Sequence, residues 1–228
     1  MADNWLERQI SLIGEDKTSL LKDKRVMVFG VGGVGSYTVE ALCRCGIGSL
    51  VLVDGDTVSE SNINRQLIAT TKNIGQSKAD AACERVKEIN PECNVTALNV
   101  FADATNTASL LDSYRPDFIV DAIDCVSTKI LIALWAHENG VKIIASMGTG
   151  NKLDPSKFQI TDISKTSVCP LARVMRKELK DRGITKMPVL FSTEDPVRTG
   201  QRVTSSISFV PSVAGLMIAG YVINELIK

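Results

Sequence analysis

The sequence predicts an α/β protein with a mostly parallel sheet and helices on both faces. Short apolar runs predict strands at residues 26–29, 50–53, 95–100, 118–122 and 142–146. Helical patterns at 35–45, 78–89, 106–113 and 127–138 alternate with them. Strands alternating with helices indicate βαβ units, and apolar strands indicate a sheet buried on both faces.

The pattern changes after Gly150. Strands are predicted at 158–163 and 189–192, on either side of a charged helix at 170–182. An amphipathic helix or pair of helices is predicted at 3–23. The apolar run at 213–227 contains Asn224 and Glu225 and is shorter than the roughly 20 residues that a spanning helix needs. It predicts a buried core or dimer helix without stable membrane insertion, and contact with a membrane surface is the alternative.

Composition limits the classes of function. Lys plus Arg and Asp plus Glu both total 26, so there is no overall basic character for nucleic acid, and any such contact needs a local patch. The six cysteines form no C-x-x-C pair, and the first residues lack a signal-peptide pattern. Free thiols in the cytoplasm are therefore expected.

A glycine-rich turn follows the first strand. The run GVGGVG contains Gly30, Gly32, Gly33 and Gly35 and fits G-x-G-x-x-G between a strand and a helix. Such glycines let the backbone come close to a ligand at a helix N-terminus, and Asp54 ends the next strand, where a carboxylate can bind ribose hydroxyls. The pattern predicts a Rossmann-like fold that binds an adenosine nucleotide. The alternative is a tight structural turn.

Polar residues after the second strand point to phosphate. Asn62, Asn64, Arg65 and Gln66 lie in the polar segment after that strand, and Lys78 opens the next helix. Arginine offers a planar fork and lysine a point charge to phosphate oxygens, which suits a triphosphate under attack at phosphorus. Each could instead be an ordinary surface charge.

Two carboxylates lie where the strand at 118–122 ends. Ligands of open parallel sheets bind at the carboxyl ends of the strands. Asp124, just past the strand, is the predicted ligand of the Mg²⁺ that accompanies ATP. Asp121 is expected to make a structural hydrogen bond.

Together these residues resemble the ubiquitin-activating and sulfur-carrier-adenylating superfamily, with its ThiF/MoeB-type adenylating domain. The resemblance implies that Arg8, in an R-Q-I motif, reaches across a homodimer as an arginine finger. Implied catalytic residues are Arg8, Arg65, Lys78 and Asp124, with Asp124 the metal ligand. The implied nucleotide-binding residues are Gly30, Gly32, Gly33, Gly35, Asp54, Asp56, Asn62, Arg65, Gln66 and Lys78.

The second half resembles one branch of that superfamily, the tRNA threonylcarbamoyladenosine dehydratases. Leu153 to Thr166, Pro170-Leu171-Ala172 and the run from Phe191 to Glu194 match it. The resemblance implies one domain over 1–228, with a nucleotide-binding core at 1–150 and a substrate-side extension at 151–228. It implies ligase-like, ATP-dependent cyclisation of the modified adenosine at tRNA position 37 through adenylation of the threonine carboxylate.

A basic segment could contact tRNA. Residues 165–186 hold seven basic side chains against Glu178 and Asp181. The predicted tRNA-binding residues are Lys165, Arg173, Arg176, Lys177 and Lys180, with Arg198 and Arg202 extending the surface. A solvated helix face is the alternative.

Other readings remain open. The chain could adenylate a ubiquitin-like sulfur carrier, although the two zinc-binding C-x-x-C pairs usual there are missing. It could be an NAD-dependent oxidoreductase or a noncatalytic nucleotide-binding module. Cys125 or Cys169 could be a nucleophile, whereas His137 is expected to be structural. The sequence leaves undecided whether a monovalent cation binds and whether a sulfur-transfer partner such as a cysteine desulfurase is needed.

Overall fold

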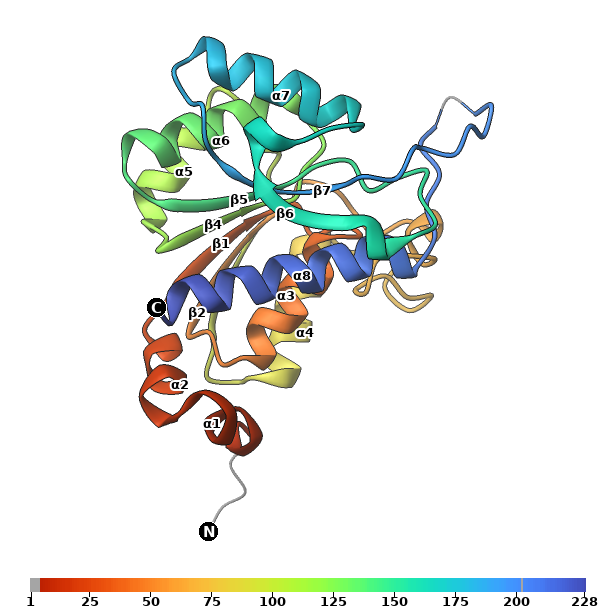
Figure 1. Cartoon of the computed structure of the whole chain (residues 1–228). Helices are drawn as coiled ribbons and strands as arrows, with labels where there is room; N and C mark the ends of the chain where they lie inside the picture. Colours follow the sequence, from red (N-terminus) through yellow and green to blue (C-terminus); the bar gives the residue numbers. More distant parts are fainter. Residues whose placement is uncertain (1–4, 202) are drawn as a thin grey trace.

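The computed structural model describes residues 5–201 and 203–228, which form a sheet of seven strands (Figure 1). The strands are β1 (Arg25–Phe29), β2 (Ser49–Val53), β3 (Asn94–Leu98), β4 (Phe118–Asp121), β5 (Lys142–Ser146), β6 (Phe158–Asp162) and β7 (Pro188–Ser192). Their order is β3-β2-β1-β4-β5-β7-β6, and β6 is the one antiparallel strand. The predicted Rossmann-like, mostly parallel sheet is confirmed.

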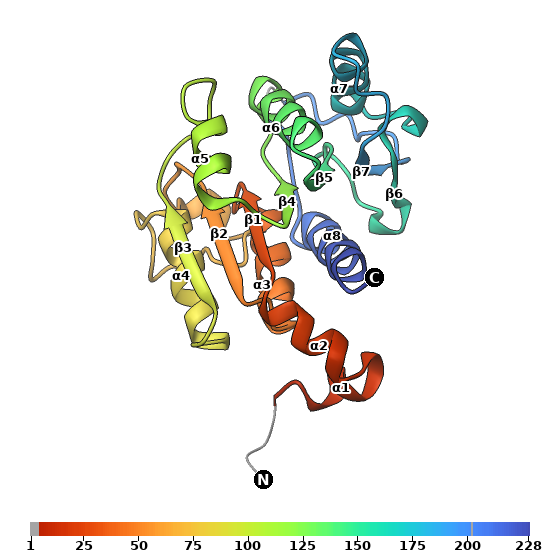
Figure 2. The same ribbon diagram turned by 90° about the vertical axis from the view of Figure 1, so that its left-hand side faces the viewer.

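Helices cover both faces of the sheet, as the sequence predicts. They are α1 (Glu7–Ile13), α2 (Glu15–Lys22), α3 (Gly35–Arg44), α4 (Lys78–Ile89), α5 (Thr107–Tyr114), α6 (Val126–Glu138), α7 (Pro170–Asp181) and α8 (Phe209–Leu226), with 3-10 turns η1 (Glu60–Asn62), η2 (Pro155–Lys157) and η3 (Ile163–Lys165). Figures 1 and 2 show α3, α4 and α8 on one face and α5, α6 and α7 on the other. Most predicted and observed ends differ by no more than two residues, as for β3, which ends at Leu98. Helix α8 is an exception, because it begins at Phe209, four residues before the predicted start at 213.

Strand β1 shows why its residues are apolar throughout. Val26 and Val28 belong to the core cluster shared with α3, α4 and α8, whereas Met27 and Phe29 belong to the cluster under α5 and α6. Successive side chains of a strand point to opposite faces, so a strand covered on both sides has no solvent-facing position. The chain reverses its order of strands at β1, which pairs with both β2 and β4. A crevice for a ligand forms at the carboxyl ends of strands at such a point.

The C-terminal segment both extends the sheet and returns to its centre. Strands β7 and β6 lengthen the sheet beyond β5, as expected. Helix α8 then packs on α3, and the Gly215 carbonyl accepts a hydrogen bond from the Thr38 hydroxyl at 3.0 Å. By length and composition α8 could cross a membrane, with mean hydropathy 1.4. It buries Ala214, Ile218 and Val222 in the core instead, which agrees with the predicted core helix.

The predicted N-terminal helices are α1 and α2; residues 3 and 4 of that prediction lie outside the described chain. They sit at the amino end of the central strands (Figure 2). Buried Leu6 covers Gly46, and the Gln9 side-chain amide donates to the Cys45 carbonyl at 3.0 Å. These contacts hold α1 against the C-terminal end of α3.

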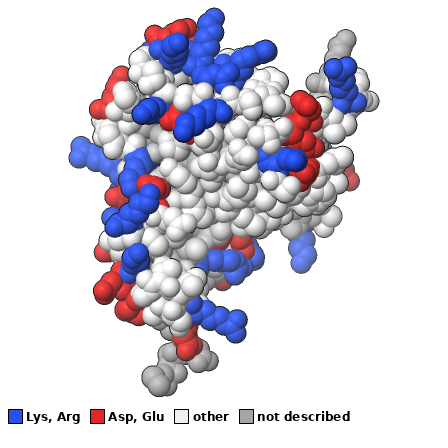
Figure 3. Space-filling view, in the orientation of Figure 1, with Lys and Arg blue, Asp and Glu red and all other residues white. Residues whose placement is uncertain are grey.

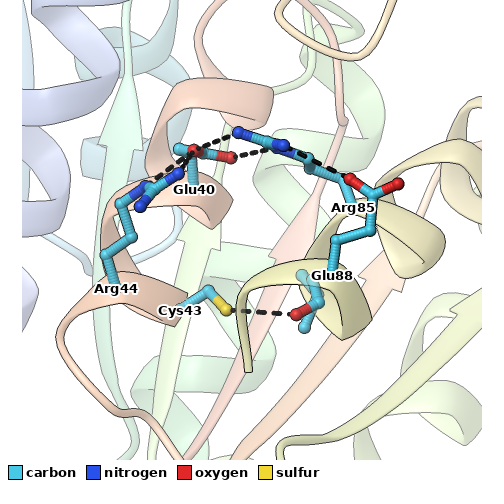
Figure 4. A network of polar contacts seen from close by, with 6 residues as sticks. Glu40, Cys43, Arg44, Arg85 and Glu88 are labelled. Carbon is cyan, nitrogen blue, oxygen red and sulfur yellow. Dashed lines mark hydrogen bonds and ion pairs between the residues drawn. The ribbon is translucent and has the colours of Figure 1, made fainter. Parts of the chain in front are cut away.

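Glu40 on α3 binds two arginines, Arg44 on the same helix and Arg85 on α4, and the contact with Arg85 joins the two helices (Figure 4). Arg85 donates from Nε and Nη2 to the two carboxylate oxygens, both at 3.0 Å, and Arg44 donates at 2.7 Å. Burial acts to raise the pKa of Glu40, but the hydrogen bonds from Arg85 and Arg44 leave that pKa below its ordinary value. The folded state therefore favours the ionised carboxylate.

We expect Glu40→Gln to lower the free energy of unfolding by about 1–2 kcal/mol near neutral pH, because the three charge-assisted hydrogen bonds from Arg85 and Arg44 weaken. A carboxylate with a depressed folded pKa stabilises above its ordinary pKa of 4.5, and that stability is lost as pH falls through the folded pKa. Urea unfolding from about pH 7 to about pH 3 should show the gap between wild type and variant closing below about pH 4.5. Glu88→Gln, on the exposed end of the network, is the control; an equal loss there would contradict the assignment.

Candidate active site

The glycine loop between β1 and α3 leaves no room for side chains at two positions. Gly30 has φ +85°, and a Cβ there would lie 2.8 Å from the Ala122 carbonyl oxygen. A Cβ on Gly35 would clash with the Gly30 carbonyl. Glycine is therefore required for the chain to turn this tightly into α3. At Gly32, by contrast, a Cβ would make ordinary van der Waals contact with Gln66 Nε2 at 3.6 Å, so no clash requires glycine there.

Asp54 holds the glycine loop in place. Its Oδ2 accepts the Val31 backbone N–H at 2.7 Å, and its Oδ1 accepts the Asp56 N–H at 2.9 Å. Each carboxylate oxygen keeps further acceptor capacity. Asp54 can thus shape the loop and still bind a ribose hydroxyl, the role that the sequence predicts.

Arg65 and Gln66 lie directly over the loop. The Cγ atom of Arg65 is 3.6 Å from a Cβ placed on Gly33, and its Nη1 donates to the Ser61 carbonyl at 2.8 Å and to Asn64 Oδ1 at 2.9 Å. Gln66 is buried, and within the described residues its Oε1 has no hydrogen-bond partner. A buried amide oxygen without a partner is costly, and a ligand that donates a hydrogen bond would remove that cost.

Lys78 is buried at the start of α4, where its Nζ donates to Asp56 Oδ2 at 2.7 Å. This ion pair fixes the ammonium group in one place. Asn62 is more committed than the sequence suggests: its Oδ1 accepts the Ser59 N–H at 3.1 Å in a capping box at η1. Only its amide nitrogen remains for a nucleotide.

Asp124 lies just past β4, exposed and with no side-chain hydrogen bond to any described residue. Its segment adjoins the glycine loop, because Gly30 packs against Ala122 and Ile123. The described chain holds no cluster of three His, Cys, Asp or Glu side chains that could bind a metal alone. One carboxylate with phosphate oxygens and water is a usual Mg²⁺ environment, so the residues present fit that ion.

Asp121 is structural, as the sequence predicts, but its partner was not foreseen. The fully buried Lys129 donates to Asp121 Oδ1 at 2.9 Å, to the Ile123 carbonyl at 3.1 Å and to the Ser146 carbonyl at 2.9 Å. Burial raises the pKa of Asp121, and the Lys129 ammonium acts in the opposite direction. The pair ties the ends of β4 and β5 to the turn that carries Asp124.

Arg8 is exposed on α1, far from its own glycine loop. The neighbouring Gln9 binds Cys45 at the end of α3, and the loop lies at the other end of that ten-residue helix, roughly 15 Å away. Within one chain the structure does not bring Arg8 to the site.

The basic segment at 165–186 centres on α7. Figure 3 shows Lys and Arg side chains gathered over this helix, at the top of the view. Lys165, Arg173, Lys177 and Lys180 are exposed. Arg176 is half-buried, and its Nη1 donates to the Thr166 carbonyl and hydroxyl at 2.8 and 2.6 Å, so it holds η3 in place. Arg202 lies outside the described residues.

The carboxyl edge of the central strands thus combines a close-packed glycine loop, two fixed cations and a free carboxylate. That set can bind a nucleoside triphosphate and stabilise charge during attack at phosphorus. Comparison with known proteins agrees. The ThiF family model matches residues 6–228.

The chain belongs to the ThiF family. It is 41% identical to the tRNA threonylcarbamoyladenosine dehydratase of Bacillus subtilis, over 95% of this chain and 92% of that protein. The crystal structure of the Escherichia coli tRNA N6-threonylcarbamoyladenosine dehydratase, TcdA, with AMP superposes with a TM-score of 0.92 at 33% identity, covering 99% of this chain and 96% of that one. The crystal structure of the same enzyme with ATP superposes with a TM-score of 0.91, covering 99% of this chain and 96% of that one.

Two cysteines near this ThiF-family site differ in reactivity. Cys125 is exposed at the start of α6, and hydrogen bonds with Ser127 and Thr128 lower its pKa to about 7. Cys169 is buried at the start of α7, where its sulfur faces Gly148. Only Cys125 therefore presents a reactive thiol at this edge of the sheet.

We expect iodoacetamide to label Cys125 before Cys43 and Cys93, whose pKa values burial raises to about 12 and about 11. The labelling rate, followed by peptide mass spectrometry, should rise as pH passes about 7. We also expect Cys125→Ser to keep the full rate of the ATP-dependent reaction described below, because adenylation of a carboxylate needs no thiol. Loss of turnover in a folded Cys125→Ser protein would instead support a thiol nucleophile.

Proposed function

We propose that this chain is an ATP-dependent tRNA threonylcarbamoyladenosine dehydratase. The observation that carries the proposal is the phosphate-binding edge formed by the glycine loop, Arg65, Lys78 and Asp124. Similarity to dehydratases over nearly the whole chain supports the choice of substrate. Adenylation of a ubiquitin-like sulfur carrier is not favoured, because the chain has no C-x-x-C pair.

The chemistry needs positioning more than a protein nucleophile. A carboxylate oxygen of the threonine attacks the α-phosphorus of ATP and expels pyrophosphate. The carbamoyl group of the same nucleoside then attacks the acyl carbon, expels AMP and closes the ring, so the nucleoside loses one water. Because the substrate supplies both nucleophiles, the protein has to hold the reactants close and neutralise charge.

Each site residue has a place in this scheme. The loop and Asp54 bind the adenosine part, Gln66 offers its unpartnered oxygen to a donor on the nucleotide, and Arg65 and Lys78 neutralise phosphate oxygens. Asp124 would hold Mg²⁺, which supplies charge neutralisation on the phosphates when bound.

A homodimer would complete the site. Exposed Arg8 cannot reach its own glycine loop, so its proposed role as an arginine finger requires a second subunit. Figure 3 shows a broad face without charged side chains, in the region of α8 and β6 in Figure 1. Leu216 on α8 and Leu12 on α1 are 49% and 83% exposed. Apolar side chains exposed to this degree suit an interface between two copies.

The exposed basic residues of α7 and η3 are proposed to contact the tRNA backbone, because phosphate contacts supply most of the affinity for RNA. This group comprises Lys165, Arg173, Lys177 and Lys180. We also propose a cytoplasmic location, since all six cysteines are free thiols.

Incubation with ATP, Mg²⁺ and tRNA carrying threonylcarbamoyladenosine tests the proposal. After digestion, the mass of the nucleoside should fall by that of one water. Asp124→Ala should slow this reaction about 100-fold or more, because a group that stabilises the transition state is lost. Its circular dichroism should match wild type, and Asp16→Ala on α2 is the matched control. Unchanged turnover in Asp124→Ala would exclude the assigned role of this carboxylate.

Mixed dimers test whether Arg8 acts in trans. Arg8→Ala and Asp124→Ala should each be inactive alone. Co-expressed with different tags, they should recover roughly a quarter of wild-type turnover, since half the dimers form with one intact composite site each. Pairing Arg8→Ala with the double variant should restore nothing. Absence of recovery in purified heterodimers would rule out an arginine acting across the interface.

A further inference from the structure

Three buried lysines lie around the active-site edge, and one lacks a carboxylate partner. Lys78, Lys129 and Lys152 are 7%, 0% and 5% exposed. Lys78 pairs with Asp56 and Lys129 with Asp121, each within 2.9 Å. Lys152 Nζ makes one hydrogen bond within the described chain, to the Glu194 backbone carbonyl at 2.6 Å, and no carboxylate of the described residues lies within 4.0 Å.

The side chain of Glu194, whose backbone carbonyl binds Lys152, is committed elsewhere. The Glu194 carboxylate accepts the backbone N–H groups of Leu153 and Asp154 at 2.9 and 3.0 Å. A buried ammonium group with one neutral acceptor keeps donor capacity, and its charge has no ion-pair partner among the described residues. Such an arrangement favours an anion brought by a ligand.

Lys152 lies at the same edge of the sheet as the adenylation site. It follows β5, whose end Lys129 ties to the turn before Asp124. On the other side, residues 193–201 and 203–208 between β7 and α8, here called the crossover, reach the nucleotide residues. The Ser206 carbonyl in the crossover accepts from the Asn64 amide at 3.1 Å, and Asn64 binds Arg65.

The backbone around Lys152 is closely constrained. Asn151 has φ +56°, and both its backbone N–H and its Oδ1 bond to Ser205 of the crossover at 2.8 Å. A Cβ on Gly150 would clash with Thr204. A residue in this uncommon conformation persists because its surroundings hold it there, and such positions cluster at functional sites.

We infer that Lys152 is a positioning residue for the anionic part of the substrate. Its charge, held at the Glu194 carbonyl where the crossover begins, orients the threonine carboxylate of the modified adenosine toward the phosphates of ATP. This inference rests on the proposed function and adds a residue that the proposed mechanism does not use. Arg65 and Lys78 serve the nucleotide, whereas Lys152 serves the group that attacks it.

Binding of two RNAs separates this role from general RNA affinity. The probes are anticodon stem-loops with and without the threonylcarbamoyl group, each with fluorescein, measured by anisotropy with Mg²⁺ and α,β-methylene-ATP to prevent adenylation. Wild type should bind the modified RNA more tightly than the unmodified RNA. In Lys152→Met the ratio of these two affinities should fall by about tenfold, the change expected when one charge contact is lost. Lys152→Arg should keep the preference.

The matched control is Lys157→Met, an exposed lysine five residues further along the same segment, which should leave the ratio of the two affinities unchanged. An equal loss for both RNAs in Lys152→Met would overturn the inference, since it would indicate a phosphate contact or a structural role. So would an unchanged ratio. The KM for ATP should not change in Lys152→Met, because the nucleotide residues are intact.

A second measurement uses the wild-type protein and does not depend on the folding of the variant. A stem-loop in which the threonine carboxylate is replaced by its neutral amide should bind as weakly as the unmodified RNA; binding equal to that of the acid would overturn the inference. Wild-type turnover is measured first by loss of one water. Its absence would reject the proposed function, whereas turnover with an unchanged affinity ratio would reject only the role of Lys152.

Discussion

The carboxyl edge of this sheet depends on the buried ion pair between Asp121 and Lys129. Two ions this far from water need hydrogen-bond partners for their remaining donors and acceptors. Lys129 has them, in two backbone carbonyls as well as the carboxylate, whereas Asp121 Oδ2 has no partner among the described residues. Because these acceptors come from the end of β4, its following turn and the end of β5, one ammonium group sets the spacing of three segments. Asp124 and the loop that leads to Lys152 directly follow the Ile123 and Ser146 carbonyls that Lys129 holds.

The glycine loop adds a second constraint at the same edge. Gly30 packs on Ala122, so the turn after β4 forms one wall of the loop, and Asp54 holds the loop from β2. The three central strands therefore place the groups that we propose to bind the adenosine, the phosphates and the metal ion relative to one another. The chain has no net charge, yet basic side chains can gather at this edge, because the fold decides which of the positive and negative side chains lie there.

Local patterns in the sequence predicted the sheet, its helices and the glycine loop, because these features depend on neighbouring residues. Contacts between distant segments could not be predicted in this way. Lys129 lies in an apolar helical pattern, and nothing nearby indicates that it meets Asp121. The return of α8 onto α3 and the ties between the crossover and Asn151 likewise depend on strand order. Asn62 shows a different limit of sequence patterns. Its residue type suits phosphate binding, but in the structure its side-chain oxygen caps the turn η1.

The site residues divide into groups that are fixed and groups that are free. Asp56 holds Lys78, Ser61 and Asn64 hold Arg65, and Gln66 is buried, so the entropy cost of ordering these side chains is met when the protein folds. Asp124 and Arg8 are exposed instead. In the proposed mechanism the fixed groups bind the nucleotide, and the free groups belong to components that arrive separately, the metal ion and the second subunit. Preorganisation is thus concentrated where the negative charge develops, which is where fixed dipoles and charges lower a barrier most.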